Sequence, residues 1–405
     1  MDSLNDIMSK MKRLIKPLPW QAVFLLLPHL RYLRNFAGLA LFFFLITACP
    51  DPPETTDCGA HQVEVNGECE CEKGYHWNED ETKCLMDTTS HNFIWTIDTL
   101  GISGSLRDVQ IIDENNIWVV GEIETDTATY NAARWNGNEW EYIEIESGSI
   151  TLYSITYFNE NDIWVCSGIP MHWDGLAWTS YHLWNMGVLN PDDGGVHYSW
   201  GTSSSDMYFV GNKGSIVHYD GTSFTKMASP TTQDLDGIVG VFDSETGEKR
   251  IWVNGWGGYP YRGFLMQYNG TDWEIVWDEH NPFFEDSQYV EPTLHIPDEK
   301  YLVVYSGGTD HGIFSIHDQK DLHQYEIIHQ NYNGYIRSLA GDKVNDIIGV
   351  GDLTNAIHFN GSTVAQIDEL ENMVPAFRYL AVDSQDGIIV IVSDTPYVIR
   401  GRKLE

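Results

Sequence analysis

The sequence predicts an all-β protein built mainly from seven copies of one unit, on three observations. The string I-W-V, at residues 117–119, 163–165 and 251–253, marks a slot that recurs every 41 to 51 residues. Each copy alternates polar and apolar residues, and most contain tight-turn pairs such as Asn-Gly or Asp-Gly. A period of about 43 residues is typical of a four-stranded blade, so we predict a seven-bladed β-propeller. The slot is occupied by Trp118, Trp164, Tyr208, Trp252, Val303, Ile348 and Ile389.

The first copy shows how the unit divides into four strands. It reads L-R-D-V-Q-I-I-D, I-W-V-V-G-E-I, A-A-R-W and E-W-E-Y-I-E-I, with turns at E-N-N and N-G-N. Short β-branched and aromatic runs of this kind favour strands. The slot residue lies on the second strand, where we expect it to fill the interface with the next blade.

The seventh copy stops one strand short of a blade. The segment H-N-F-I-W-T-I-D-T, residues 91 to 99, precedes the first copy and reads like an outer strand such as W-E-Y-I-E-I. We predict that residues 91 to 99 pair with the last strand near Tyr397 to Arg400. This pairing would close a propeller spanning residues 91–405 and remove two open sheet edges.

The repeated pattern D-I-W-V-x-G…H-x-D-G…W has a recognisable relative. It resembles the bacterial propeller repeats grouped with the WD40-, YVTN- and BNR-like families, over residues 102 to 402. The sialidase Asp-box S-x-D-x-G-x-x-W is absent, and so is the WD dipeptide at its WD40 position. The resemblance therefore implies a propeller but argues against a glycosidase.

The N-terminal segment is typical of an export signal. Arg31 and Arg34 precede an apolar run of about a dozen residues, too short to cross a bilayer as a helix. The run ends in L-I-T-A-C, which resembles a bacterial lipobox and implies acylation, including palmitate, at Cys49 after removal of residues 1–48. A start codon assigned too far upstream, with Met11 as one candidate for the true start, would account for the long segment before the apolar run. An uncleaved membrane anchor is the alternative.

A small cysteine module follows the expected lipid anchor. Residues 49–57, C-P-D-P-P-E-T-T-D, should form an extended tether, and residues 58–84 contain four cysteines. Disulfides persist in exported chains, and three pairings are possible. The run G-E-C-E-C-E-K-G-Y resembles the second half of an epidermal-growth-factor-like module. This resemblance implies Cys58–Cys69 and Cys71–Cys84, with residues 85–90 as a linker; zinc binding with His61 and His76 is the alternative.

The charge of the chain limits its partners. It has 23 basic and 59 acidic residues, and residues 49–405 contain 17 of the basic and 57 of the acidic ones. A strongly acidic surface repels phosphate backbones, so nucleic-acid binding is excluded. We expect a soluble monomer held at the membrane by lipid, in the bacterial cell envelope at the outer membrane or cell surface.

The sequence contains no recognised catalytic motif. A P-loop, H-E-x-x-H, G-x-S-x-G and G-x-G-x-x-G are all absent, and we expect no cofactor. We interpret His317, His323 and His329 as exposed strand and loop positions rather than a metal site. Cys166 lies within a strand, where we expect a buried free thiol.

Two classes of function fit these observations. The first is a non-enzymatic binding module whose propeller presents a loop-rich face to a protein or a polysaccharide. The second is a sialidase-like or lyase-type enzyme acting on an acidic polysaccharide at the mouth of the central channel. Fold analogy alone does not choose between them.

The expected binding face carries the loops between blades and those between the second and third strands of a blade. These loops are long and rich in aromatic residues, with loop packing as the alternative role. The aromatic residues are Trp184, Trp256, Tyr259, Tyr261, Phe283 and Phe284.

Three arginines are expected at the channel mouth. Aligning the innermost strands places Arg107, Tyr153, Tyr198, Asp236, Leu294, Arg337 and Arg378 in one slot. Arg337, Arg378 and Arg107 would then lie side by side and could bind a carboxylate or sulfate. The alternative is that each pairs with a local acid such as Asp108 or Asp383. A slip of one residue in this alignment would turn the side chains away.

Overall fold

The computed structural model describes residues 58 to 404, except 148, 244–245, 258–261, 279–290, 299, 308–311, 331–334 and 372. The expected signal peptide, Cys49 and the tether therefore lie outside the described residues. Within the described part, no helix is both long and apolar enough to cross a membrane. The chain forms two compact units, residues 1–72 and 73–405.

The described part of the first unit is a small disulfide-linked hairpin. Strands β1 (Gln62–Val65) and β2 (Glu68–Cys71) pair antiparallel, and Cys58 is bonded to Cys69 as the resemblance implied. Cys71 and Cys84 are also disulfide-bonded. These four cysteines therefore offer no thiolate to a metal, and the zinc alternative is wrong. The second unit begins with another hairpin, β3 (Tyr75–Trp77) and β4 (Cys84–Met86).

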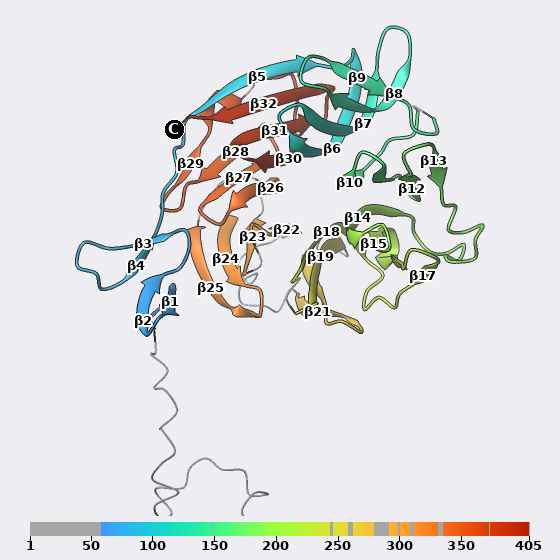
Figure 1. Cartoon of the computed structure of the whole chain (residues 1–405). Helices are drawn as coiled ribbons and strands as arrows, with labels where there is room; N and C mark the ends of the chain where they lie inside the picture. Colours follow the sequence, from blue (N-terminus) through green and yellow to red (C-terminus); the bar gives the residue numbers. More distant parts are fainter. Residues whose placement is uncertain are drawn as a thin grey trace, which may run out of the picture. The chain divides into compact units, whose positions relative to one another are not determined.

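The rest of the second unit is a seven-bladed propeller, as predicted. Seven four-stranded antiparallel sheets follow one another around a ring in the described residues (Figure 1). The first three blades are β6 (Ser103–Asp113), β7 (Asn116–Glu124), β8 (Thr129–Trp135) and β9 (Trp140–Ile143); β10 (Ser154–Asn159), β11 (Asp162–Cys166), β12 (Pro170–Trp173) and β13 (Trp178–Ser180); and β14 (Val196–Ser203), β15 (Asp206–Gly211), β16 (Ile216–Tyr219) and β17 (Phe224–Lys226), with the short 3₁₀ turn η2 (Asn212–Gly214).

The remaining blades have the same order from the innermost to the outermost strand. They are β18 (Asp234–Phe242), β19 (Lys249–Gly257), β20 (Arg262–Tyr268) and β21 (Trp273–Trp277); β22 (Glu291–His295), β23 (Tyr301–Gly307), β24 (Gly312–Asp318) and β25 (Asp321–Gln330); β26 (Ile336–Lys343), β27 (Asp346–Gly351), β28 (Ala356–Phe359) and β29 (Val364–Gln366); and β30 (Tyr379–Gln385), β31 (Ile388–Ser393), β32 (Tyr397–Lys403) and β5 (Phe93–Thr99), with a second 3₁₀ turn, η4 (Asp368–Leu370).

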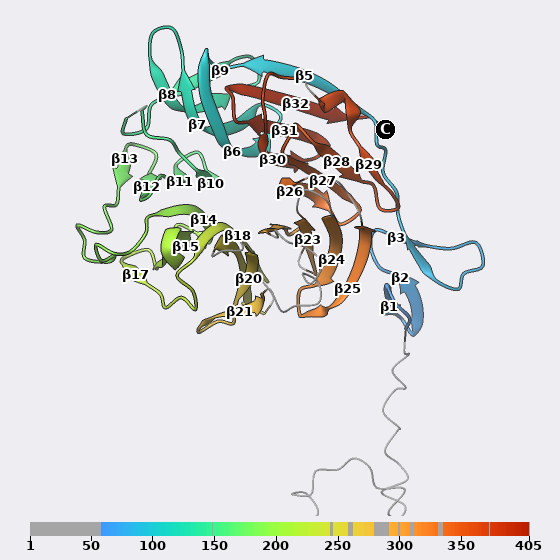
Figure 2. The ribbon, with the colours of Figure 1, turned by 180° about the vertical axis from the view of Figure 1, so that it is seen from behind.

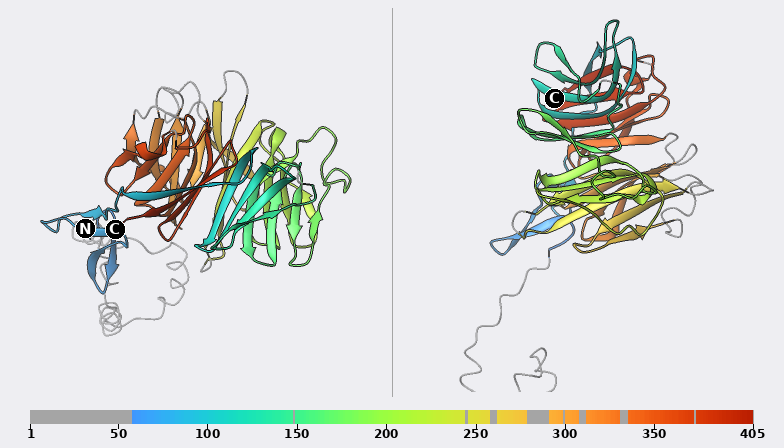
Figure 3. Two further views of the ribbon diagram at one scale, coloured as in Figure 1. Left: turned by 90° about the horizontal axis from the view of Figure 1, so that it is seen from above. Right: turned by 90° about the vertical axis from the view of Figure 1, so that its right-hand side faces the viewer.

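The ring is closed by a strand from the other end of the propeller. β5 pairs antiparallel with β32, from Tyr397 opposite Thr99 to Lys403 opposite Phe93, as expected for residues 91 to 99. Seen from behind, β5 lies along β32 at the outer edge of the seventh blade (Figure 2), and Figure 3 shows the ribbon in two further views. Closure thus joins strands whose paired residues are 298 to 310 positions apart in sequence.

One ion pair fastens this closure to the first blade. Arg400 on β32 donates to Asp98 on β5 through Nε at 2.6 Å and through Nη2 at 3.2 Å. The Arg400 guanidinium lies 3.9 Å from the ring centre of Trp135, and Trp140 donates its indole N–H to Asp98 at 3.1 Å. Blades seven and one are therefore joined by charge, hydrogen bonds and cation–π contact.

The core lies between the blades. Every slot residue of the repeated string is on the second strand of its blade and is buried. Trp164 of the second blade packs with Met207, Phe209 and Val217 of the third, which confirms its predicted place at the interface. Burying one such side chain stabilises the fold by about 1.5–3 kcal/mol. Cys166 in this cluster is a buried free thiol, as expected.

Three blade interfaces also contain polar bonds that explain the rest of the repeated pattern. In the second blade His172 lies 2.9 Å from Asp162 and stacks on Trp164 at 4.3 Å between ring centres. Trp164 donates its indole N–H to Ser204 of the third blade at 2.7 Å, and Ser204 in turn donates to Asp162. The pattern D-I-W…H therefore places a hydrogen-bonded carboxylate, ring and imidazole at a blade boundary.

Other blades keep the carboxylate and imidazole but change the third partner. Asp206 accepts from His218 at 2.9 Å and from Lys249 of the fourth blade at 2.9 Å. In the sixth blade Asp346 bonds His358 at 2.7 Å and also meets Lys403 of the seventh blade. The pairing is thus a recurring joint between neighbouring sheets.

The closing strand provides the first testable prediction. Deleting residues 91 to 99 removes the β5 ladder and leaves Arg400 without its carboxylate. We expect a loss on the order of 5 kcal/mol in the free energy of unfolding and a drop of about 10 °C or more in Tm. The variant Asp98→Asn, which keeps the strand, should lower the melting temperature by less. A melting curve unchanged by the deletion would contradict this account of closure.

Candidate functional site

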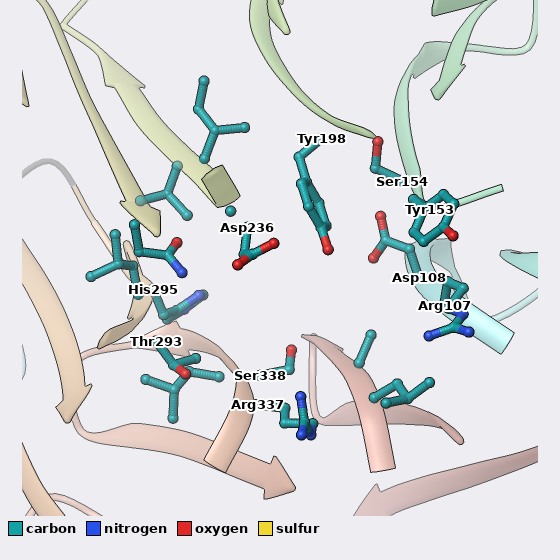
Figure 4. A pocket seen from close by; sticks show the side chains of 18 of the residues that line it. Arg107, Asp108, Tyr153, Ser154, Tyr198, Asp236, Thr293, His295, Arg337 and Ser338 are labelled. Atoms are coloured by element: carbon teal, nitrogen blue, oxygen red, sulfur yellow. The ribbon is translucent and has the colours of Figure 1, made fainter. Parts of the chain in front are cut away.

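The innermost strands of all seven blades surround one cavity at the centre of the propeller. Its volume is about 440 Å³, and Figure 4 shows polar side chains lining it from several directions. The wall is formed by Arg107, Asp108, Tyr153, Ser154, Tyr198, Ser199, Asp236, Gly237, Ile238, Val239, Asn254, Trp256, Thr293, Leu294, His295, Tyr335, Arg337, Ser338, Leu339, Leu380 and Ala381.

The cavity lies toward the end of the propeller where the long loops emerge. Most lining residues stand near the beginning of an inner strand, and each inner strand begins where the chain arrives from the previous blade. This end carries the connections 144–153, 181–195 and 367–378, whereas the opposite end carries short turns such as 114–115 and 174–177. We call the long-loop end the loop face.

A β-bulge recurs at the same point of the inner strand in five blades. The register slips between Leu106 and Asp108 in the first blade, and at the matching point in four others. A bulge re-aims the side chain of the extra residue. The bulged residues are Arg107, His197, Asp236, Arg337 and Leu380.

The bulges correct the predicted alignment of the inner strands. Tyr198 follows the bulge of the third blade rather than occupying it, and in the seventh blade the bulged residue is Leu380. Arg378 precedes β30, outside the lining of the cavity. The error arose because the spacing from the bulged residue to the slot on the second strand differs between blades, being 11 residues between Arg107 and Trp118 but 9 between Leu380 and Ile389.

The three expected arginines separate into a pair and a single residue. Arg337 Nη2 lies 3.2 Å from Asp352 Oδ2, and Arg378 Nε lies 3.5 Å from Asp352 Oδ1. Arg107 instead lies over the ring of Tyr153, with 5.6 Å from Cζ to the ring centre, and forms no ion pair with any described residue. The structure therefore brings Arg337 and Arg378 together and leaves the Arg107 guanidinium available at the cavity.

The acids suggested as alternative partners for the arginines have another role. Asp108 accepts the N–H of Ile155 in the second blade at 2.9 Å and that of Val109 at 2.8 Å. Burial raises the pKa of Asp108 to about 7, against the lowering effect of these two backbone bonds. The alternative that an arginine pairs with Asp108 is therefore wrong, although Arg337 and Arg378 do pair with another local acid, Asp352.

Asp383 acts in the same way between the seventh and first blades. It accepts the N–H of Ile111 at 2.6 Å and of Ser384 at 2.9 Å, and burial raises its pKa to about 6. The pairing of Asp383 with an arginine was also wrong, since its oxygens face backbone donors. Both carboxyl groups join neighbouring inner strands that share no backbone ladder.

Other cavity residues join blades through neutral groups. Thr293 donates to the carbonyl of Ile336 at 2.8 Å, and Ser338 accepts the N–H of Val382 at 3.1 Å. His295 bonds the carbonyl of Gly341 at 2.7 Å, and burial lowers the pKa of His295 to about 4. This imidazole is neutral at physiological pH and donates its Nε2–H, so it serves structure rather than proton transfer.

The three histidines at residues 317, 323 and 329 differ in their exposure. His317 is buried and bonds Ser315 at 2.8 Å and the carbonyl of Leu322 at 3.0 Å, so its predicted exposure was wrong. His323 is exposed, as expected, whereas the side chain of His329 lies outside the described residues. Within the described part of the chain, no three His, Cys, Asp or Glu residues are grouped to hold a metal ion.

The predicted aromatic face is described only in part. Trp256 lines the cavity and Trp184 lies in the connection 181–195, each 38 % exposed. Tyr259, Tyr261, Phe283 and Phe284 lie outside the described residues. Two exposed apolar residues of the loop face, Leu353 and Phe377, were not predicted, because neither belongs to a motif.

Comparison with known proteins supports the fold and no specific activity. No family model and no curated protein sequence matches the chain. The solved structure of YCF48 bound to D1 peptide matches with a TM-score of 0.56 and 15 % identity, over 78 % of this chain and 97 % of that one. Virginiamycin B lyase from Staphylococcus aureus matches with a TM-score of 0.57 and 10 % identity, over 77 % of this chain and 100 % of that one. The WD40 propeller domain of Doa1 matches with a TM-score of 0.52 and 12 % identity, over 78 % of this chain and 99 % of that one.

Titration of Asp108 provides a second prediction. The folded chain keeps a proton on this carboxyl that the unfolded chain loses above its ordinary pKa of 3.8. The stability it contributes is therefore complete below pH 4 and is lost as pH rises toward 7. From pH 4.5 to 8, the free energy of unfolding of Asp108→Asn relative to wild type should rise by on the order of 3 kcal/mol.

Chemical denaturation at several pH values measures this difference. Asp174→Asn is the control, because backbone N–H groups at a turn lower the pKa of that exposed carboxyl. The difference in free energy of unfolding between Asp174→Asn and wild type should stay constant above pH 5. A constant difference for Asp108→Asn as well would show that Asp108 ionises normally.

Proposed function

We propose that the chain is an extracytoplasmic binding module whose loop face receives a protein or a polysaccharide. The observation that carries this proposal is Arg107, a guanidinium without an ion-pair partner among the described residues, exposed at the central cavity of a strongly acidic chain. The ring of Tyr153 and the β-bulge hold Arg107 in place before any ligand arrives. Such preorganisation lowers the entropy cost of binding.

The surroundings of Arg107 favour recognition over catalysis. Trp256 adds an exposed aromatic surface to the same cavity, and aromatic residues and arginine are enriched where proteins bind partners. The neutral His295 and the backbone-bonded Asp383 are already engaged between blades. We therefore propose that the cavity mouth binds a carboxylate or sulfate without transforming it.

An enzyme acting on an acidic polysaccharide is the second candidate. One observation favours it: Asp108, whose pKa is raised to about 7, lines the same cavity as Arg107. A carboxyl group with that pKa suits general acid or base catalysis. Both of its oxygens already accept backbone N–H groups, so we prefer the binding function.

A panel of polysaccharides and proteins tests the two candidates. The full chain is immobilised and offered acidic and neutral polysaccharides and envelope proteins, and both retention and chain cleavage are measured. We expect retention without cleavage. Arg107→Gln should weaken retention of the bound partner by about 10-fold or more, since a charge-assisted hydrogen bond is lost.

A matched variant controls for loss of charge alone. Arg402 is also exposed and lies on β32, where it pairs with Glu114, so Arg402→Gln removes a guanidinium away from the cavity. It should leave retention unchanged. Cleavage of an acidic polysaccharide that Asp108→Asn abolishes would favour the enzyme, and equal retention by Arg107→Gln would remove Arg107 from the site.

We also propose that acylated Cys49 tethers a monomeric chain in the bacterial cell envelope, at the outer membrane or the cell surface. The lipobox-like L-I-T-A-C and the proline-rich segment after it support this proposal. The intact mass of the mature protein should correspond to a chain that begins at Cys49 and carries diacylglyceryl and amide-linked acyl groups, which together give stable anchoring. A mature chain with an unmodified Cys49 would contradict the tether.

A further inference from the structure

The loop face of blades six and seven carries an exposed apolar pair. Leu353 lies between β27 and β28 and is 68 % exposed, and Phe377 precedes β30 and is 56 % exposed. The two residues are neighbours, because the N–H of Leu353 donates to the carbonyl of Phe377 at 2.8 Å. Large apolar side chains held together in water are typical of a contact surface.

Leu353 is held outward by a conformation that its side chain disfavours. Leu353 has φ 57° and Thr354 has φ 55°, in the left-handed region that leucine and β-branched residues rarely adopt. The turn is closed by hydrogen bonds from Gly351 N–H to Asn355 O at 2.9 Å and from Asn355 N–H to Asp352 O at 3.1 Å. The hydrogen-bonded turn therefore holds the Leu353 side chain in its exposed position.

The third blade contains the same turn with a less strained sequence. There Gly211 N–H donates to Ser215 O at 3.1 Å, and the left-handed positions are Lys213, with φ 55°, and Gly214, with φ 69°. Glycine at the second position avoids the steric cost. The turn can thus be built without leucine or threonine, so the fold does not require Leu353 at this exposed position.

Two arginines flank the apolar pair. Arg337 and Arg378 share the single carboxylate of Asp352, and the Arg378 guanidinium lies 5.4 Å from the ring centre of Phe377. The Arg378 Nε is buried and lies 3.5 Å from Asp352 Oδ1, whereas the side chain as a whole is 44 % exposed. The exposed part of the Arg378 side chain therefore places a positive charge beside an apolar surface.

One further acid lies near this surface. Asp394 accepts the N–H groups of Phe377 and Arg378 at 3.0 and 3.2 Å and so fixes the segment that carries both side chains. Arg337 and Arg378 share the carboxylate of Asp352, and Asp394 Oδ1 accepts backbone N–H groups, whereas the whole chain has a formal net charge of −36. An acidic ligand would meet far less repulsion at this patch than the average surface of the chain presents.

We propose that Leu353, Phe377 and Arg378 form a docking site for an extended segment of a partner protein. The segment places an apolar side chain against Leu353 and Phe377 and an adjacent carboxylate on Arg378. An aliphatic and an aromatic side chain beside a guanidinium suit a peptide better than a sugar, whose hydroxyl groups would lose water against Leu353. This inference rests on the proposed binding function and specifies a protein as the partner.

Selection from a phage-displayed library of random dodecapeptides on the full chain tests this site. We expect the enriched peptides to contain Asp or Glu next to Leu, Ile, Phe or Trp. Phe377→Ser and Arg378→Gln should each weaken binding of a synthetic enriched peptide by at least about 10-fold, the size of effect of losing one buried contact or one charge-assisted hydrogen bond. Leu176→Ser is the control and should leave peptide binding unchanged. Leu176 is also an exposed apolar residue, at 88 %, but it lies at the opposite end of the propeller.

Leu353→Gly separates docking from folding. Glycine relieves the left-handed backbone, so the variant should melt at the same or a higher temperature and yet bind the peptide more weakly. Enriched peptides without Asp or Glu, no enriched peptide at all, or unchanged binding by all three variants would overturn the docking site. If enriched peptides lose binding only with Arg107→Gln, the docking site fails and the proposed function stands.

Discussion

The structure depends on how neighbouring blades are joined where no backbone ladder links them. Inside a blade, four strands satisfy one another's N–H and C=O groups, but the inner strands of adjacent blades belong to separate sheets. Side chains must therefore make the connection, through buried aromatics such as Trp164 and Trp252 and through polar groups that reach the next backbone. This requirement explains Asp108, Thr293, His295 and Ser338 in the central cavity.

The same requirement limits how a functional site can be recognised in such a fold. Asp108 has the raised pKa that is usually sought in an active site, yet its two oxygens hold Ile155 and Val109 in place. A residue becomes a better candidate when no structural task accounts for it. Arg107, Leu353 and Phe377 meet that criterion, because the blades pack without them.

The fold was largely predictable from sequence, and the site only in part: Arg107 and Trp256 were expected and line the cavity, whereas Arg378 was misplaced. The period of the I-W-V string, its place on the second strand and the closing strand all follow from local patterns that repeat along the chain. Arg378 was misplaced by two residues because the spacing between the inner-strand bulge and the second-strand slot varies between blades, and no motif in the sequence marks the bulge. Asp352 and Leu353 belong to no repeated motif, and their meeting with Phe377 depends on loops from two blades.

The place of β5 has a consequence for the order in which the chain can mature. The first propeller strand to be synthesised must wait for β32, the last, before its hydrogen bonds have partners. The ring therefore cannot be completed until the C-terminal strand has been made and is free to pair. Because loop closure over so long a stretch is slow, the unfinished seventh blade stays open until then. The first six blades can each form from consecutive strands, whereas the seventh depends on both ends of the propeller.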